Sequence, residues 1–119
     1  MADFQIANDP NQALDINVVG QTPHVFAYRM WHKGPSAADW TQFADGDNGD
    51  SVPDHIQVGP LEDGTLLKAA FAVGGKAKNF RVLLTFSQNG KMVIGGAITV
   101  SGQTLSGGGG ARVITIVLA

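Results

Sequence analysis

The amino-acid sequence predicts an all-β fold, an antiparallel β-sandwich of about eight short strands. The first observation behind this prediction is a two-residue alternation of apolar and polar residues, which recurs without any sustained helical period. The second is composition, because the chain has 16 glycines but a single glutamate, Glu62. The third is the dipeptide Asn89-Gly90 between two apolar segments, which is the preferred connection of a tight β-hairpin.

The first two predicted strands cover residues 14–18 and 24–31. In the first, Leu14, Ile16 and Val18 alternate with polar residues, which is typical of a strand with one buried face. In the second, Phe26, Tyr28 and Met30 share one face, and the alternating residues, including Trp31, share the other.

Residues 33–63 are rich in glycine and proline and are predicted to be mainly loops. Two short strands are expected within them, at residues 40–44 and 55–58. A further strand is expected at residues 65–73, entered through the turn Glu62-Asp63-Gly64.

The Asn-Gly hairpin joins predicted strands at residues 80–88 and 91–100, and a two-residue loop implies a definite pairing register. The predicted partners are Gln88–Lys91, Phe86–Val93, Leu84–Gly95, Val82–Ala97 and Phe80–Thr99. The pair Gly95-Gly96 predicts a bulge or a close backbone approach at that point.

The last predicted strand, residues 111–119, is apolar on both faces, which indicates an interior position. Together these strands predict one domain over residues 1–119. Immunoglobulin-like and jelly-roll strand orders both fit the pattern, and a small β-barrel is the alternative architecture.

Charge divides the chain into two unlike halves. Residues 1–63 hold ten acidic groups and only Arg29 and Lys33, a net charge of −8, whereas residues 64–119 hold six basic groups and no acidic one, a net charge of +6. If the halves form separate surfaces, complementary charge favours self-association into homo-oligomers. If their strands interleave, which is the more usual arrangement in a sandwich, the charges pair within each molecule.

Several classes of function are disfavoured by composition. The absence of cysteine excludes disulfides and thiolate chemistry, and a net charge of −2 does not indicate a nucleic-acid partner. No apolar segment is long enough to span a membrane. The first residues lack a signal-peptide pattern, so a cytoplasmic location is expected, and release without a signal is compatible with the same sequence.

The candidate ligand site is the loop-rich segment from residue 31 to residue 55. Trp31 and Trp40 would stack on the apolar face of a sugar ring, and polar side chains nearby would bind its hydroxyl groups. The candidate binding residues are Trp31, His32, Trp40, Asp54 and His55. The alternative is that both tryptophans belong to the core.

A candidate calcium site lies in the acidic loop that follows. Its ligands would be Asp45, Asp47, Asn48 and Asp50, since hard cations prefer oxygen ligands on a flexible loop. The segment lacks the closing glutamate and the glycine position of an EF-hand, so a solvated turn is the alternative.

No nucleophile, cofactor or paired-carboxylate motif points to catalysis, so the sequence predicts a non-enzymatic protein. The leading hypothesis is a lectin-like module that binds carbohydrate through residues 31–55. The alternative hypothesis is a structural protein that assembles through its acidic and basic halves.

Overall fold

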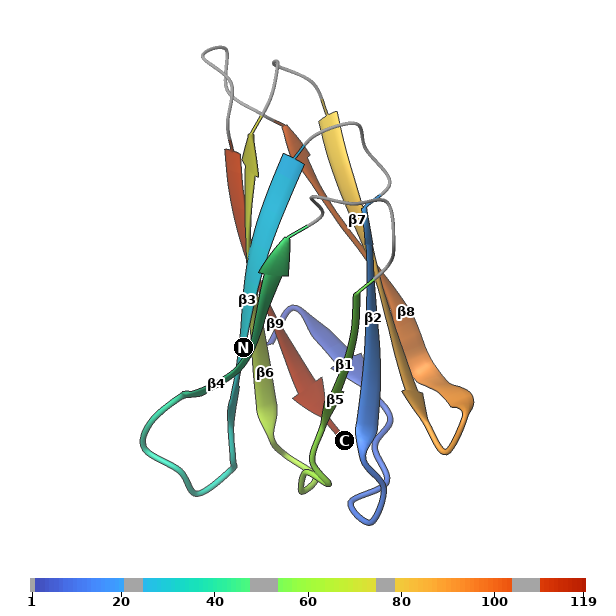
Figure 1. Cartoon of the computed structure of the whole chain (residues 1–119). Helices are drawn as coiled ribbons and strands as arrows, with labels where there is room; N and C mark the ends of the chain where they lie inside the picture. The colour runs from blue at the N-terminus through green and yellow to red at the C-terminus, as the bar shows by residue number, and fades with distance from the viewer. Residues whose placement is uncertain (1, 21–24, 48–53, 75–78, 104–109) are drawn as a thin grey trace.

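The computed structural model describes residues 2–20, 25–47, 54–74, 79–103 and 110–119, which form nine strands in two sheets (Figure 1). The strands are β1 Phe4–Ile6, β2 Leu14–Gly20, β3 Val25–Lys33, β4 Thr41–Asp47, β5 Asp54–Val58, β6 Leu66–Gly74, β7 Asn79–Gln88, β8 Lys91–Gln103 and β9 Gly110–Leu118. The five-stranded sheet has the order β1-β9-β6-β3-β4, and the four-stranded sheet has the order β5-β2-β7-β8. Neighbouring strands pair antiparallel except β1, which runs parallel to β9.

The predicted all-β sandwich is confirmed. The strands lie in two separate sheets rather than in one closed barrel, and the sheets enclose a continuous cluster of buried apolar side chains. The eight predicted strands correspond to β2–β9 with ends moved by a few residues. The ninth strand, β1, was not predicted, because its three residues are too few to show an alternation.

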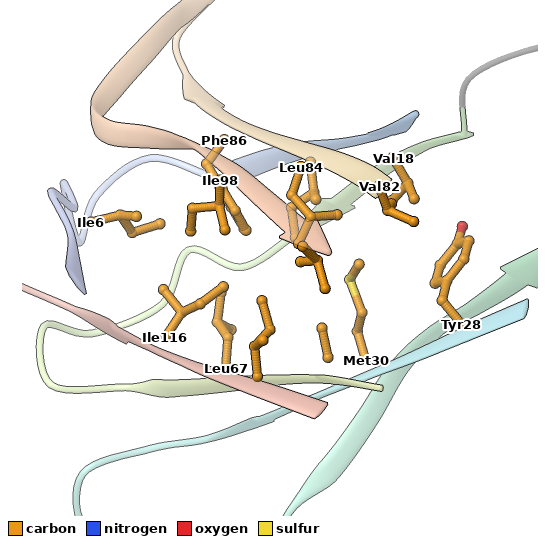
Figure 2. Packing of buried hydrophobic residues seen from close by; sticks show 14 of the residues in the cluster. Ile6, Val18, Tyr28, Met30, Leu67, Val82, Leu84, Phe86, Ile98 and Ile116 are labelled. Atoms are coloured by element: carbon orange, nitrogen blue, oxygen red, sulfur yellow. The ribbon is translucent and has the colours of Figure 1, made fainter. Parts of the chain in front are cut away.

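The core forms because alternate residues of every long strand point inward. In β3, Tyr28 and Met30 are buried, whereas Ala27 and Arg29, which alternate with them, are exposed. Figure 2 shows side chains of the two sheets facing each other across this interior. The largest fully buried side chains are Phe71, Phe86, Ile6, Leu14, Ile16, Leu84, Ile114, Ile116 and Leu118.

A bulge in the β7–β8 hairpin changes the predicted register. Gln88 pairs with Lys91 as predicted, but Thr85 pairs with Ala97, and Leu84 pairs with Ile98 rather than with Gly95. The predicted register extends to Ser87, which pairs with Met92, but the predicted partners of Leu84, Val82 and Phe80 are wrong. The reason is that β8 contains extra residues that simple counting from the turn does not reveal.

The bulge is located at the predicted glycine pair. Gly95 has a φ of 78°, a left-handed conformation that favours glycine. A Cβ atom on Gly96 would lie 2.6 Å from the carbonyl oxygen of Phe86 and 2.8 Å from that of Val93. The glycines therefore permit two backbone segments to approach each other more closely than any side chain would allow.

Strand β1 connects the two sheets at one edge of the sandwich. The amide of Ala7 donates to the carbonyl oxygen of Ile94 in β8 at 3.0 Å, and the amide of Ala119 donates to the carbonyl oxygen of Ile6 at 3.0 Å. The buried side chain of Gln88 holds the following loop, because its Oε1 accepts from the Asp9 amide at 2.9 Å and its Nε2 donates to the carbonyl oxygen of Gln12 at 3.1 Å.

The two halves of the chain occupy opposite lateral sides of the sandwich. Strands β3 and β4 lie together at one end of the five-stranded sheet, and β2 and β5 lie together at one end of the four-stranded sheet. Contacts between β4 and β5 place these two ends on the same side of the molecule. Strands β6–β9 form the other side, so only β1 crosses from the acidic half to the basic half (Figure 1).

Candidate functional site

Two indole rings and two ammonium groups gather on the outer face of the five-stranded sheet. The Nζ atom of Lys68 lies 4.7 Å from the ring centroid of Trp31 and 4.5 Å from that of Trp40. The Nζ atom of Lys33 lies 5.8 Å from the ring centroid of Trp40. All four side chains are half-buried. We call these residues, Trp31, Trp40, Lys33 and Lys68, the aromatic cluster.

Strand alternation and pairing together build the aromatic cluster. Because Met30 points into the core, the next residue of β3, Trp31, points to the outer face. Lys68 in β6 points outward for the same reason and is the direct cross-strand partner of Trp31. Trp40 immediately precedes β4, and its ring reaches back over Lys68.

Polar groups continue the row of Trp31 and Lys68 across the sheet. On one side Gln42 of β4 is the exposed cross-strand partner of Trp31, and on the other Thr115 of β9 is the partner of Lys68. The carboxylate of Asp3 accepts a hydrogen bond from the Thr115 amide at 2.9 Å. The row therefore offers amide, hydroxyl and carboxylate groups beside the two rings.

A trough of about 510 Å³ begins one row further along the same face. Small side chains line its floor, among them Ala70 and Ala72 of β6 and Ala111 of β9, and Arg29 and Asp45 stand at its rim. This volume is in the usual range for small-molecule sites, and small floor residues let a ligand approach the backbone closely. The aromatic cluster and the trough thus form one outward-facing surface.

His32 does not belong to this surface. It follows Trp31 directly, so its side chain points to the opposite side of β3. There the centroid of its ring lies 5.5 Å from the ring centroid of Phe43. An irregularity in the β3–β4 pairing beside Phe43 lets both Phe43 and Ala44 pack against the core. His32 therefore lies at the rim of the sandwich interior.

Asp54 and His55 lie on the other sheet. Both belong to β5, which pairs with β2 at the edge of the four-stranded sheet. The Nε2 atom of His55 is 3.5 Å from the Oδ1 atom of Asp15, its neighbour on β2. Of the five predicted ligand-binding residues, the structure brings together only Trp31 and Trp40.

The predicted calcium ligands are only partly described. Asp45 and Asp47 belong to β4, where they are paired with Arg29 and Ala27, and Asn48 and Asp50 lie outside the described residues. Within the described segments, no group of three or more histidine, aspartate or glutamate side chains could hold a metal ion. The first two predicted ligands therefore lie on a paired strand rather than on a loop.

Comparison of the chain with protein-family models, with curated proteins and with solved structures found no match. None of the described residues forms a helix long and apolar enough to cross a membrane. The functional interpretation therefore depends on the geometry of the surface itself.

Lys33 and Lys68 were missed as site residues in the sequence. The alternation of Leu67, Ala69 and Phe71 already indicates that Lys68 points outward. What the sequence does not indicate is that β6 lies beside β3, and only that neighbourhood places Lys68 against Trp31.

Proposed function

We propose that this protein is a non-enzymatic, lectin-like module that binds carbohydrate on the outer face of its five-stranded sheet. The observation that carries the proposal is the pair of half-exposed indole rings, Trp31 and Trp40, which converge on Lys68. An indole ring stacks on the apolar face of a sugar, and amide or hydroxyl groups nearby bind the sugar hydroxyls. Gln42 and Thr115 provide such groups in the same row.

The surrounding structure supports a site of this kind. Trp31 and Lys68 stand on paired strands in the interior of the sheet, and rigid elements hold binding groups more precisely than loops do. The trough over Ala70 and Ala72 gives a second sugar unit room beside the rings. The proposed site therefore extends from Trp40 along β6.

The test is a glycan-array screen of the purified protein and of the variant Trp40→Ala. We expect the variant to lose about tenfold or more in affinity, since an aromatic stacking contact contributes roughly 1 kcal/mol beyond area burial and tenfold corresponds to about 1.4 kcal/mol. Thermal stability should remain close to that of the parent. His55→Ala is the matched control, because His55 is exposed on the other sheet.

The screen is run in calcium and again in EDTA. Binding that persists in EDTA and is lost in Trp40→Ala supports the aromatic cluster as the site. Binding lost in EDTA would move the site to Asp45, Asp47, Asn48 and Asp50. If neither buffer gives binding to any glycan, the carbohydrate proposal fails.

A second candidate function is assembly of copies of this chain through oppositely charged sides. The observation that favours it is the strand order, in which β2–β5 from the acidic half and β6–β9 from the basic half lie on opposite lateral sides. Complementary sides of this kind favour head-to-tail contacts, which close into rings or extend into filaments.

A further inference from the structure

The charges of the aromatic cluster indicate what kind of saccharide the proposed site would take. Lys68 directs its ammonium group at both indole rings, at 4.7 and 4.5 Å, and Lys33 approaches the second ring at 5.8 Å. Both rings are therefore already in contact with positive charge, and any ligand stacked on Trp40 would lie next to two ammonium groups.

These ammonium groups have no acidic partner among the described residues. No described carboxylate oxygen lies within 4.0 Å of either Nζ atom, and the one ion pair between described side chains, His55–Asp15, is on the four-stranded sheet. Lys33 comes from the acidic half of the chain, where carboxylates outnumber basic groups ten to two. Among the described residues, the two ammonium groups therefore keep hydrogen-bond donors that an anionic ligand can engage.

An ammonium group in contact with a ring face keeps its hydrogen-bond donors. The attraction of Lys68 to Trp31 and Trp40 is electrostatic and acts through the ring quadrupoles, whereas an ammonium has three N–H donors. Donors that point away from the rings can bind an anion without displacing the lysine. With this geometry, Lys68 would bind a charged group of the ligand while an indole ring stacks on the sugar ring that carries this group.

The tryptophan end of the surface carries two lysines, Lys33 and Lys68, and the carboxylate of Asp3, which accepts a hydrogen bond from the amide of Thr115. Arg29, at the rim of the trough, is the cross-strand partner of Asp45, which lines the same trough. The cross-strand partner of Lys33 is Leu66, and the cross-strand partners of Lys68 are Trp31 and Thr115. Neither lysine is therefore paired in the sheet with an acidic residue. The anionic group of a ligand is therefore expected at Lys33 and Lys68, and its neutral part over the trough.

We propose that the site selects anionic saccharides, with a carboxylate or sulfate group bound by Lys68 and Lys33 and the sugar ring stacked on Trp40. This inference rests on the proposed carbohydrate-binding function and names its ligand class. A uronic acid and a sulfated sugar share the required chemistry, a sugar ring that carries a negative charge.

The experiment is titration of the full chain with matched oligosaccharides that are neutral, carboxylated or sulfated but otherwise identical. At least one anionic form should bind about tenfold or more tightly than its neutral counterpart, as expected for a hydrogen bond between charged groups. The comparison between the carboxylated and the sulfated form distinguishes the two sources of charge. Raising the salt concentration should weaken binding of the anionic form more than that of the neutral form.

The variant Lys68→Met removes the charge and keeps the aliphatic chain against the rings. We expect it to reduce the affinity for the anionic form about tenfold or more, and to reduce the affinity for the neutral form by a clearly smaller factor. Lys68→Arg should restore most of the binding. Lys91→Met, at the β7–β8 turn of the other sheet, is the matched control and should bind like the parent.

Each contrary result has a separate meaning. Equal binding of neutral and anionic forms that is insensitive to Lys68→Met overturns the charge selectivity and leaves the carbohydrate site standing. Absence of binding to every saccharide overturns both proposals. A single-stranded oligonucleotide is included because bases also stack on indole rings beside lysines, and tighter binding to it than to every saccharide would overturn the ligand class.

Discussion

Gly96 shows at the level of one residue how closely the two strands of the long hairpin approach each other. A side chain there would collide with the carbonyl oxygens of Phe86 and Val93, at 2.6 and 2.8 Å from its Cβ atom. Both obstacles are backbone atoms of paired strands, so they cannot move aside without disturbing the sheet. The position therefore requires glycine for reasons of space rather than of φ angle.

Gly96→Ala is expected to lower the free energy of unfolding by about 1–3 kcal/mol or more, the usual cost of overpacking. Gly90→Ala is the comparison, since a Cβ at Gly90 would meet nothing within 4 Å and only its φ of 75° is unfavourable for alanine. Urea denaturation of both variants measures the difference. Equal stability losses would show that the bulge relaxes to accept a methyl group.

Strand β1 shows at the level of elements how a three-residue strand can link the two sheets of the sandwich. Its backbone hydrogen bonds join it to β9 and, through Ala7, to β8. Ile6 is only 1% exposed and belongs to the main core cluster, and the partly buried Phe4 packs against that cluster. The strand therefore links the two sheets along this side of the sandwich.

Ile6→Ala should destabilise the protein by about 2–5 kcal/mol, because it leaves a cavity in the core. Ile94→Ala is a control with the same chemical change at a residue that is 85% exposed, and it should change stability by no more than about 0.5 kcal/mol. Thermal or urea denaturation compares the two. Similar losses in both variants would contradict the role assigned to β1.

The whole molecule carries its charge unevenly. Strands β2–β5, from the acidic half of the chain, and strands β6–β9, from the basic half, lie on opposite lateral sides of both sheets, so the two sides of the molecule come from segments of opposite net charge. This arrangement differs from the interleaving expected for a sandwich, because within both sheets the strands of each half stay next to each other, with β1 as the exception.

If this asymmetry drives assembly, light scattering at low salt should give a mass above the 12.4 kDa of one chain. The mass should fall towards that of one chain near 1 M salt, where the screening length is about 3 Å. Arg81→Glu, on the basic side, should weaken the association at low salt. A strict monomer at low salt would contradict the assembly hypothesis.

The parts of the structure that depend on neighbouring residues along the chain were predictable. Alternation alone indicates that Tyr28 and Met30 point inward and that Trp31 and Lys68 point outward, because successive side chains of a strand lie on opposite faces. The Asn89-Gly90 turn likewise indicates the hairpin. For the same local reason, the pair Gly95-Gly96 indicates the bulge.

Only the tertiary structure decided which outward residues meet. Trp31 and Lys68 come together because β3 and β6 are neighbours, and His55 and Asp54 leave the predicted site because β5 joins the other sheet. The hairpin register beyond Ser87 also depended on the bulge in β8, where Ile94 accepts a hydrogen bond from the amide of Ala7 after β1. By itself the sequence determined the faces of the strands, since facing is a property of the local backbone. Which strands become neighbours depends on the packing of the whole core. The tertiary structure therefore decided which residues make up the candidate site.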